Sequence, residues 1–359
     1  MKKILVIILQ FAIVFYSYAQ TTYVPDDVFE QKLIYMGLDD VLDDYVLTAS
    51  IDTVTVLNLG NPITGQAEIQ DLTGLQDFVS LKEFYSKYHD FSTLDVSNVP
   101  DLEWISIQNN TALSGIDVSN NPNLKHLELW GPSYSFNSLD LSNNTLLEHV
   151  SIRYFHNLTN IQVNNLPNLK VLDLFNNSIS NININNDGNL EYLVLTMTHI
   201  TQLDISNNTE LKVFIMEMNN NYIQQITFNN PNLQYLMLND CPNLNALDLS
   251  SMLELHTLNV TNTGVSNINF GDISKIKFAY IHDNSQLTQL DFSNFSNLKI
   301  MEVNNNSLNF LDVRNGNQIG IMRFKAQNNP SLSNILVDDP NGFYINDWIF
   351  DNNVTFTDF

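Results

Sequence analysis

The sequence predicts a mainly β solenoid, in which short coils of chain stack on one another around one long core. Three observations predict this class. A hydrophobic motif recurs at near-constant spacing, the extended segments are too close together for helices between them, and asparagine makes up 54 of the 359 residues, with none before Asn58. Repeats of about 20–50 residues form such arrays because one repeat cannot bury its apolar face alone.

The repeated motif is L-x-x-L-x-L, which recurs from Leu81 onward in two alternating forms. Form A reads as in Leu124-x-x-Leu127-x-Leu129, and form B carries Asp at position 5, as in Leu244-x-x-Leu247-Asp248-Leu249. The A segments are predicted to start at residues 81, 102, 124, 147, 169, 190, 211, 233, 255, 276, 298 and 319, which gives coils of 21–23 residues. Apolar positions 4 and 6 alternate with period 2, so each coil should hold two short extended segments joined by tight turns.

Asparagine is expected at the bends of these coils. Position 9 is often Asn, as in Asn110 and Asn177 of form A and Asn121 and Asn144 of form B. An inward Asn side chain can satisfy backbone groups where the chain turns, and stacked coils would then form a hydrogen-bonded ladder. Cys241 occupies the same position, where a small buried residue is favoured over a reactive thiol.

Residues 1–19 have the layout of a secretory signal peptide. Lys2 and Lys3 precede an apolar stretch over 4–16, and Ser17-Tyr18-Ala19 places small residues before Gln20. The apolar stretch is short for a membrane span, which needs about 20 residues. We therefore expect export to the extracellular space or cell surface, or to the periplasm without a further secretion route, and no membrane span in the mature chain.

Caps are expected at both ends of a solenoid that covers residues 53–337. Residues 20–52 should form a helical cap, with one helix over 25–36 that ends at Gly37 and a second around 39–47. Four acids lie in the second helix: Asp39, Asp40, Asp43 and Asp44. They lack the spacing of a calcium-binding loop, so a solvated helix face is favoured. Residues 338–359 should form a C-terminal cap over the last coil, through Phe343, Trp348, Ile349 and Phe356.

Composition and motifs exclude several classes of protein. With 15 basic and 39 acidic residues the net charge is −24, which argues against a nucleic-acid partner because phosphate neutralisation needs clustered Lys and Arg. A single Cys excludes an intramolecular disulfide. No nucleophile, zinc or phosphate-binding motif is present, so we predict no enzymatic activity, no cofactor and no metal. His126 and His149 fall near Glu128 on neighbouring coils, but nothing guarantees three converging ligands.

These segments resemble leucine-rich repeat proteins, whose signature is L-x-x-L-x-L-x-x-N. The sequence is similar to secreted members of the Bacteroidota, particularly flavobacteria, with repeats of this length. The resemblance is carried by residues 24–30, 37–40, 94–98 and 337–339 together with Trp348 and Asp351. It implies a leucine-rich repeat solenoid in an exported protein. Many such proteins continue into a sorting domain for type IX secretion, so either a truncated sequence or a different final route is expected.

The outward positions 2, 3, 5 and 7 differ between the two forms. In form B they are mostly Ser, Asp and Asn, whereas in form A they hold many aromatic residues and ten of the thirteen basic residues of the mature chain. Aromatic rings and Arg amid mixed charge are typical of binding surfaces. We expect form A on the concave side. Nine of its side chains are predicted to bind a ligand: Trp104, His126, Glu128, Trp130, His149, Arg153, Asp173, Phe175 and Tyr192.

The chain is therefore interpreted as a binding module whose partner is a protein. Arg153 should lie between the rings of Trp130 and Phe175, which share position 7, and keep its donors free for a ligand carboxylate. Two alternatives stay open. One is a carbohydrate-binding or carbohydrate-active right-handed β-helix, with a glycan stacked on Trp104 and Trp130. The other is a structural spacer or adhesin without a specific ligand.

A column of aspartates is expected on form B. Asp95, Asp117 and Asp140 hold the same position in successive coils. Like charges about 5 Å apart in water repel by roughly 0.8–0.9 kcal/mol before screening. We expect hydrogen bonds from the following Ser-Asn turn to relieve this repulsion, rather than bound Ca²⁺.

Overall fold

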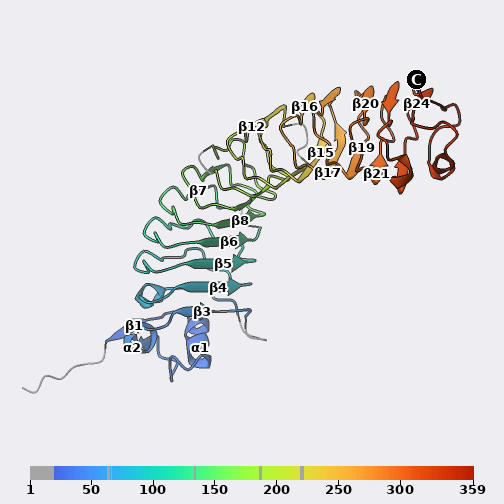
Figure 1. The fold of residues 1–359 in the computed structure, drawn as a ribbon. Coiled ribbons are helices and arrows are strands. Elements are labelled where there is room, and N and C mark those ends of the chain that lie inside the picture. The colour runs from blue at the N-terminus through green and yellow to red at the C-terminus, as the bar shows by residue number, and fades with distance from the viewer. Residues whose placement is uncertain (1–19, 63–64, 66, 133–134, 186–187, 219–221) are drawn as a thin grey trace, which may run out of the picture.

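A computed structural model of the protein describes residues 20–62, 65, 67–132, 135–185, 188–218 and 222–359. The chain forms one curved stack of coils, with helix α1 (Asp27–Tyr35) packed below the first coil and the C-terminus at the far end (Figure 1). The signal peptide predicted for residues 1–19 lies outside the described residues. No helix in the described ranges is both long and apolar enough to cross a membrane.

The twelve form A segments build a parallel sheet on the concave side of the stack, as predicted, and strand β3, which lies before the first of them, makes it a 13-stranded sheet (Figure 1). Its strands are β3 (Val56–Asn58), β4 (Glu83–Lys87), β5 (Trp104–Gln108), β6 (His126–Trp130), β8 (His149–Arg153), β10 (Val171–Asp173), β11 (Tyr192–Val194), β13 (Val213–Glu217), β15 (Tyr235–Cys241), β17 (Thr257–Thr263), β19 (Phe278–His282), β21 (Ile300–Glu302) and β23 (Arg323–Lys325). Every strand pairs with its neighbour so that residues of equal position face each other, as Leu127 does with Ile105 and Val150.

The form B segments form the opposite, less regular wall, also as predicted. Its strands are β7 (Ser138–Asp140), β9 (Asn160–Gln162), β12 (Gln202–Asp204), β14 (Gln225–Thr227), β16 (Ala246–Asp248), β18 (Asn267–Asn269), β20 (Gln289–Asp291), β22 (Phe310–Asp312) and β24 (Asn334–Leu336), and β25 (Thr355–Thr357) of the C-terminal segment pairs with β24. They pair only in short sheets of two or four strands. Within the described part of 81–337 the one helical element is the 3-10 turn η2 (Gln318–Gly320), so the coils stack without a break.

One hydrophobic core runs from Val24 to Val354 and fills the space between the two walls. The last A segment begins at residue 321 rather than at the predicted 319. Ile321, Phe324 and Ala326 are buried, whereas Ile319 and Met322 are each 73% exposed. A segment that starts at 319 and one that starts at 321 both place apolar residues at positions 1, 4 and 6. The η2 turn precedes the strand and shifts its start by two residues, so that Phe324 pairs with Met301 of β21.

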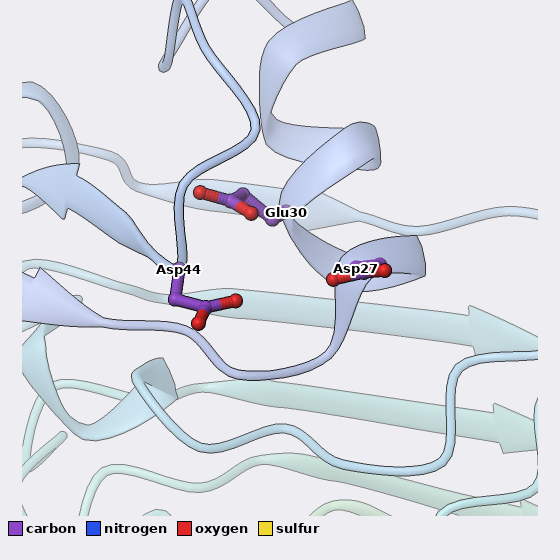
Figure 2. Close-up of side chains that lie close together, drawn as sticks. All are labelled: Asp27, Glu30 and Asp44. Atoms are coloured by element: carbon purple, nitrogen blue, oxygen red, sulfur yellow. The ribbon is translucent and has the colours of Figure 1, made fainter.

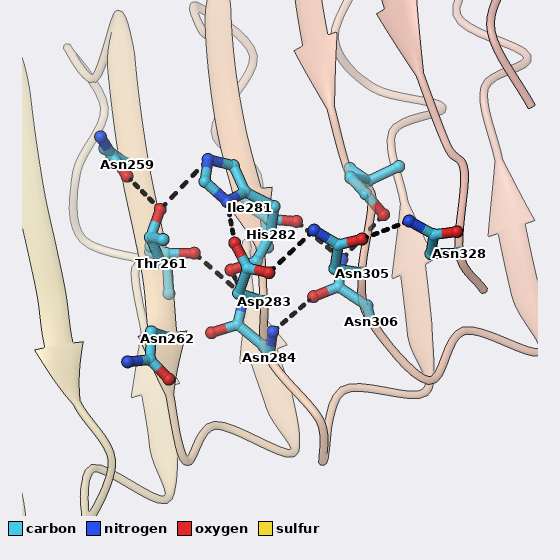
Figure 3. Close-up of polar contacts among 12 residues, drawn as sticks. Asn259, Thr261, Asn262, Ile281, His282, Asp283, Asn284, Asn305, Asn306 and Asn328 are labelled. Atoms are coloured by element: carbon cyan, nitrogen blue, oxygen red, sulfur yellow. Dashed lines mark hydrogen bonds and ion pairs between the residues drawn. The ribbon is translucent and has the colours of Figure 1, made fainter.

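In all but one of the twelve A coils, position 8 is a non-glycine residue with a left-handed backbone. The eleven non-glycine examples have φ between 51° and 68°: Tyr88, Asn109, Tyr154, Asn176, Met197, Met218, Asp240, Asn262, Asp283, Asn305 and Asn328. Gly131 holds this position in its coil. Asn and Asp tolerate this conformation better than most residues. Their side chains also bond along the stack, as from Asn305 to Asp283 and from Asn328 to Asn305 (Figure 3).

The predicted asparagine ladder follows directly after this bend and in the B turns. The Nδ2 of Asn144 donates to the carbonyl oxygens of Val118 (2.8 Å) and Asn121 (3.0 Å) in the preceding coil. On the A side, the Nδ2 of Asn306 donates to the carbonyl oxygen of Ile281 in the preceding coil and to that of Val303 in its own coil. Asn165, which also holds position 9 of a form B segment, is exposed instead. Cys241 is fully buried at position 9 of its form A segment. Asn230 and Asn329, which the position count did not place in the ladder, also belong to it.

The aspartate column on form B is held by its own turns, as expected. Oδ1 of Asp95 accepts hydrogen bonds from the backbone N (3.0 Å) and the hydroxyl (2.7 Å) of Ser97. Asp117 and Asp140 accept the equivalent backbone bonds from Ser119 and Ser142. The Ser97 hydroxyl and backbone N–H lower the pKa of Asp95 from its usual value.

The N-terminal cap contains the predicted first helix but not the second. Asp26 caps α1, since its Oδ1 accepts from the backbone N of Val28 and Phe29 (both 2.9 Å), and Gly37 follows the helix with φ 73°. Residues 39–47 are instead irregular and lead into strand β2 (Tyr45–Leu47), which pairs antiparallel with β1 (Thr21–Tyr23) before helix α2 (Thr48–Ile51).

The second helix fails because the backbone bonds of this segment go elsewhere. The carboxylate of Glu30 accepts from the N–H groups of Asp43 (3.0 Å) and Tyr45 (3.1 Å), which holds the chain extended. A helix over 39–47 would have buried four apolar side chains, but only Val46 of these is buried in the structure. The other three are exposed: Val41, Leu42 and Tyr45.

The C-terminal segment covers the last coil with only some of the predicted residues. Trp348 is 6% exposed and stacks on Phe324, with ring centroids 4.0 Å apart, and Phe356 contacts Trp348. Phe343 and Ile349 are exposed, contrary to prediction. Tyr344, from the 3-10 turn η3 (Phe343–Asp347), is buried in their place and donates its hydroxyl to Gln318.

We predict that Asn144→Ala lowers the free energy of unfolding by about 1–3 kcal/mol, because the carbonyls of Val118 and Asn121 lose a buried donor. Urea denaturation at neutral pH measures this change. The adjacent Asn143→Ala is the matched control, since Asn143 is exposed. Equal effects of the two substitutions would contradict the role of the ladder.

Candidate functional site on the concave sheet

A row of stacked rings crosses the N-terminal half of the concave sheet. Trp104, His126 and His149 share position 3 on β5, β6 and β8 and pair directly across the strands. Trp104 stacks on His126 with ring centroids 3.4 Å apart and an interplanar angle of 5°, and His126 stacks on His149 at 4.2 Å and 11°. Tyr85 continues the row beside Trp104 at 6.2 Å. We call these four residues the ring row.

The two histidines of the ring row are neutral at physiological pH. Burial is the main cause that lowers the pKa of His126 to about 4, and the neighbouring His149 adds to it. Burial also lowers the pKa of His149, while Glu128 and Asp173 oppose that shift. Stacked flat on one another, the imidazoles form an aromatic surface rather than a charged one.

Trp130, Arg153 and Asp173 form a second cluster beside the ring row. The guanidinium of Arg153 lies 4.9 Å from the ring centroid of Trp130 and forms an ion pair with Asp173, whose side chain is 4% exposed. The indole Nε1 of Trp130 donates to the Ser151 hydroxyl at 3.1 Å. A cation on an aromatic face at an exposed site contributes about 0.5–1 kcal/mol.

The expectation that Arg153 lies between the rings of Trp130 and Phe175 is therefore right for Trp130 and wrong for Phe175. Phe175 packs edge-on against Tyr154, with centroids 5.2 Å apart, and Asp173 takes a donor of Arg153 that was expected to stay free. The physical reason is that a buried carboxylate needs a counter-charge. Asp173 lies one strand over and two positions back, within reach of the long Arg153 side chain.

The other predicted residues flank these clusters. Glu128 accepts a hydrogen bond from the Ser106 hydroxyl at 2.8 Å. Tyr192 is half-buried on β11 and is separated from His149 by Val171 of β10, so the ring row does not reach it. The structure thus unites Trp104, His126 and His149, and separately Trp130, Arg153 and Asp173.

Sequence reasoning missed a ladder of alternating charge along position 2 of seven consecutive coils. Its members are Lys82, Glu103, Lys125, Glu148, Lys170, Glu191 and Lys212. Lys125 contacts Glu103 at 2.6 Å, Lys170 contacts Glu148 at 2.7 Å, and Lys212 contacts Glu191 at 2.6 Å. The hydrogen bonds and charges of Lys125 and Lys170 lower the pKa of Glu103 and of Glu148. Reading position 2 down the coils would have revealed this pattern.

Two hollows lie on the concave sheet. The first, of about 370 Å³, is lined by Lys82, Glu83, Glu103, Trp104, Lys125, His126, Glu148 and His149, and so joins the charge ladder to the ring row. The second, of about 400 Å³, lies on the C-terminal half and was not predicted as a site. There the short side chains of Thr257 and Asn259 on β17 leave a slot between Tyr235 and Met237 on one side and Phe278 and Tyr280 on the other.

The catalytic and metal interpretations gain no support from this arrangement. A carbohydrate-active enzyme would need a pair of free carboxylates, such as Asp173 with Glu128. In the structure Asp173 is paired with Arg153, and Glu128 accepts a hydrogen bond from Ser106. Across the described residues, the one group of His, Cys, Asp and Glu side chains able to share a metal ion is Asp27, Glu30 and Asp44, far from this sheet in the N-terminal cap.

Comparison with known proteins identifies the fold. No protein-family model matches the chain, and no curated protein matches it. Among solved structures, an internalin, InlF from Listeria monocytogenes, is 16% identical with a TM-score of 0.50, covering 94% of this chain and 96% of that one. TLR13 in a TLR13–ssRNA13 complex is 15% identical with a TM-score of 0.52, covering 85% of this chain and 51% of that one. An LRIM1/APL1C complex is 14% identical with a TM-score of 0.50, covering 86% and 52%.

At these identities the likeness concerns the fold alone. The chain has the leucine-rich repeat solenoid fold, built mainly of parallel strands with few helices. This fold commonly mediates protein binding.

We predict that the protein loses stability as the pH falls from 6.5 towards 4. The fold holds the pKa of His126 at about 4, below its usual 6.5, so the unfolded chain binds the proton first and unfolding becomes easier in this window. His126→Gln should flatten the pH dependence of the urea midpoint, whereas His256→Gln, outside the ring row, should change it less. A dependence unchanged by His126→Gln would refute this assignment.

Proposed function

We propose that the protein is a binding module that recognises a protein ligand through its concave sheet. The observation that supports this most is the contrast between the two walls. The convex wall uses its aspartates and serines to hold its own turns. The concave wall carries the ring row, the Trp130–Arg153 cluster and two hollows, which the coil-forming hydrogen bonds do not require.

The chemistry of the concave sheet favours a protein over a glycan. Much of one face of the Trp104 ring is covered by His126, and Trp130 is covered by Arg153, which leaves less ring surface for a sugar to stack on. The three Glu residues of the charge ladder are each paired with a Lys, so the surface offers apolar anchors within a hydrogen-bonding rim rather than one strong charge. Aromatic residues surrounded by polar groups dominate binding energy in protein interfaces.

A protein array probed with the purified protein identifies the partner, and single substitutions then locate the site. Trp130→Ala and Tyr280→Ala should each weaken binding by more than about 1 kcal/mol, the usual hot-spot threshold. Phe310→Ala is the matched control, because Phe310 is a partly exposed aromatic residue on the convex wall. A partner that binds both concave variants unchanged but loses affinity for Phe310→Ala would contradict the proposal.

We also propose that the protein is exported, from a bacterium of the Bacteroidota, after removal of residues 1–19. The basic start, the apolar stretch and the small residues before Gln20 support cleavage at that point. N-terminal sequencing of protein recovered outside the cytoplasm should begin at Gln20. Recovery of a chain that still starts at Met1 would contradict cleavage.

A further inference from the structure

Three carboxylates converge in the N-terminal cap. Asp27 and Glu30 are three residues apart on α1 and therefore lie on one side of the helix. Asp44 faces them from the turn before β2, where its carbonyl accepts from the backbone N of Val24 at 2.9 Å. One oxygen from each of the three side chains lies within 4.8 Å of the others (Figure 2).

Glu30 provides an independent observation that points to a ligand. The residue is fully buried, at 0% exposure. Its Oε1 accepts the two backbone bonds from Asp43 and Tyr45, whereas its buried Oε2 has no hydrogen-bond partner among the described residues. The cation nearest along the helix, Lys32, donates instead to the carbonyl oxygen of Asn61. A buried carboxylate oxygen without a partner is costly, so the fold leaves a place for a positive group here.

We propose that Asp27, Glu30 and Asp44 bind a Ca²⁺ ion. Calcium takes oxygen ligands at about 2.3–2.6 Å, so two oxygens on opposite sides of the ion are about 4.6–5.2 Å apart, and the observed limit of 4.8 Å fits that span. All three donors are carboxylates. Asp27 and Asp44 are exposed, so water can complete the coordination shell. Ca²⁺ accepts such irregular surroundings, whereas Mg²⁺ demands near-ideal octahedral geometry.

The ion would connect two separate elements of the cap. Asp27 and Glu30 belong to α1, whose Phe29 and Leu33 are buried in the core. Asp44 belongs to the segment that leads into β2. The cap covers the open edge of strand β3, the first of the concave sheet (Figure 1). Calcium binding therefore stabilises the end of the solenoid, where a parallel sheet would otherwise expose unpaired backbone groups.

The competing account is a proton shared between two of the carboxylates. It neutralises Glu30 without any ion and predicts no metal binding near neutral pH. Calorimetric titration of the chelator-treated protein with Ca²⁺ alone separates the two accounts. We expect one Ca²⁺ bound per chain, a melting temperature raised by several degrees that EGTA reverses, and no such rise with NaCl of equal ionic strength.

Substitutions assign the ion to this cluster. Glu30→Gln and Asp44→Asn should each weaken Ca²⁺ binding at least tenfold. Asp27→Asn should do the same at an exposed position, where failure to fold is not expected. The matched control is Asp40→Asn, which removes an exposed acid of the same cap outside the cluster and should change the dissociation constant less than twofold.

Terbium luminescence gives a second readout. Tb³⁺ in the calcium site should be sensitised by Tyr45, which follows Asp44 in the chain, and Ca²⁺ should displace it. No Ca²⁺ binding at millimolar concentration would overturn the proposal, as would binding that all three cluster variants leave unchanged. Equal affinity for Mg²⁺ would overturn the assignment to calcium.

Discussion

The fold depends on one repeated interaction, the hydrogen bond from a buried asparagine amide to a backbone carbonyl of the preceding coil. A coil of 21–23 residues must bend sharply between its two walls, and each bend turns backbone groups inward, away from water. Asn144 and Asn306 satisfy such groups, and their bonds to the preceding coil also fix the spacing between the two coils. The left-handed residue just before the asparagine on the A side makes the bend possible. Register, strand pairing and the smooth concave sheet all follow from this arrangement.

In-register stacking has a consequence for every outward position, because equal positions on neighbouring coils lie about 4.8 Å apart. The protein handles this closeness differently in each row. Over the seven coils from Lys82 to Lys212, position 2 alternates Lys and Glu, so neighbours attract. Position 3 stacks flat rings and keeps its histidines neutral. The aspartate column of the convex wall directs its carboxylates into local turns. In these stretches each row thus limits repulsion between like groups by a different physical means.

The same one-dimensional design separates stability from recognition. The core residues at positions 1, 4 and 6 and the asparagines at the bends hold neighbouring coils together, whereas positions 3, 5 and 7 of the concave wall face outward. Exchange of Tyr280 therefore changes the surface without removing a ladder bond, whereas exchange of Trp130 also removes its Nε1 bond to Ser151 of the next coil. The ends of the stack have no neighbour, and there the chain uses other means: a helix and a small antiparallel pair at the start, and Trp348 stacked on Phe324 at the end.

The sequence by itself determined the solenoid, its period, the parallel sheet of A segments, the asparagine ladder and which of the two walls is variable. These features depend on contacts between adjacent coils, which a periodic pattern encodes directly. The tertiary structure decided the rest. In it the last A segment starts at residue 321, and strand β2 takes the place of the predicted helix over 39–47. Arg153 pairs with Asp173, and the carboxylates of Asp27, Glu30 and Asp44 lie close together. Such outcomes depend on contacts between side chains at different positions of neighbouring coils, as for Arg153 and Asp173. They also depend on the packing of separate elements against one another, as for α1 and the segment before β2. A periodic sequence pattern does not encode either kind of contact.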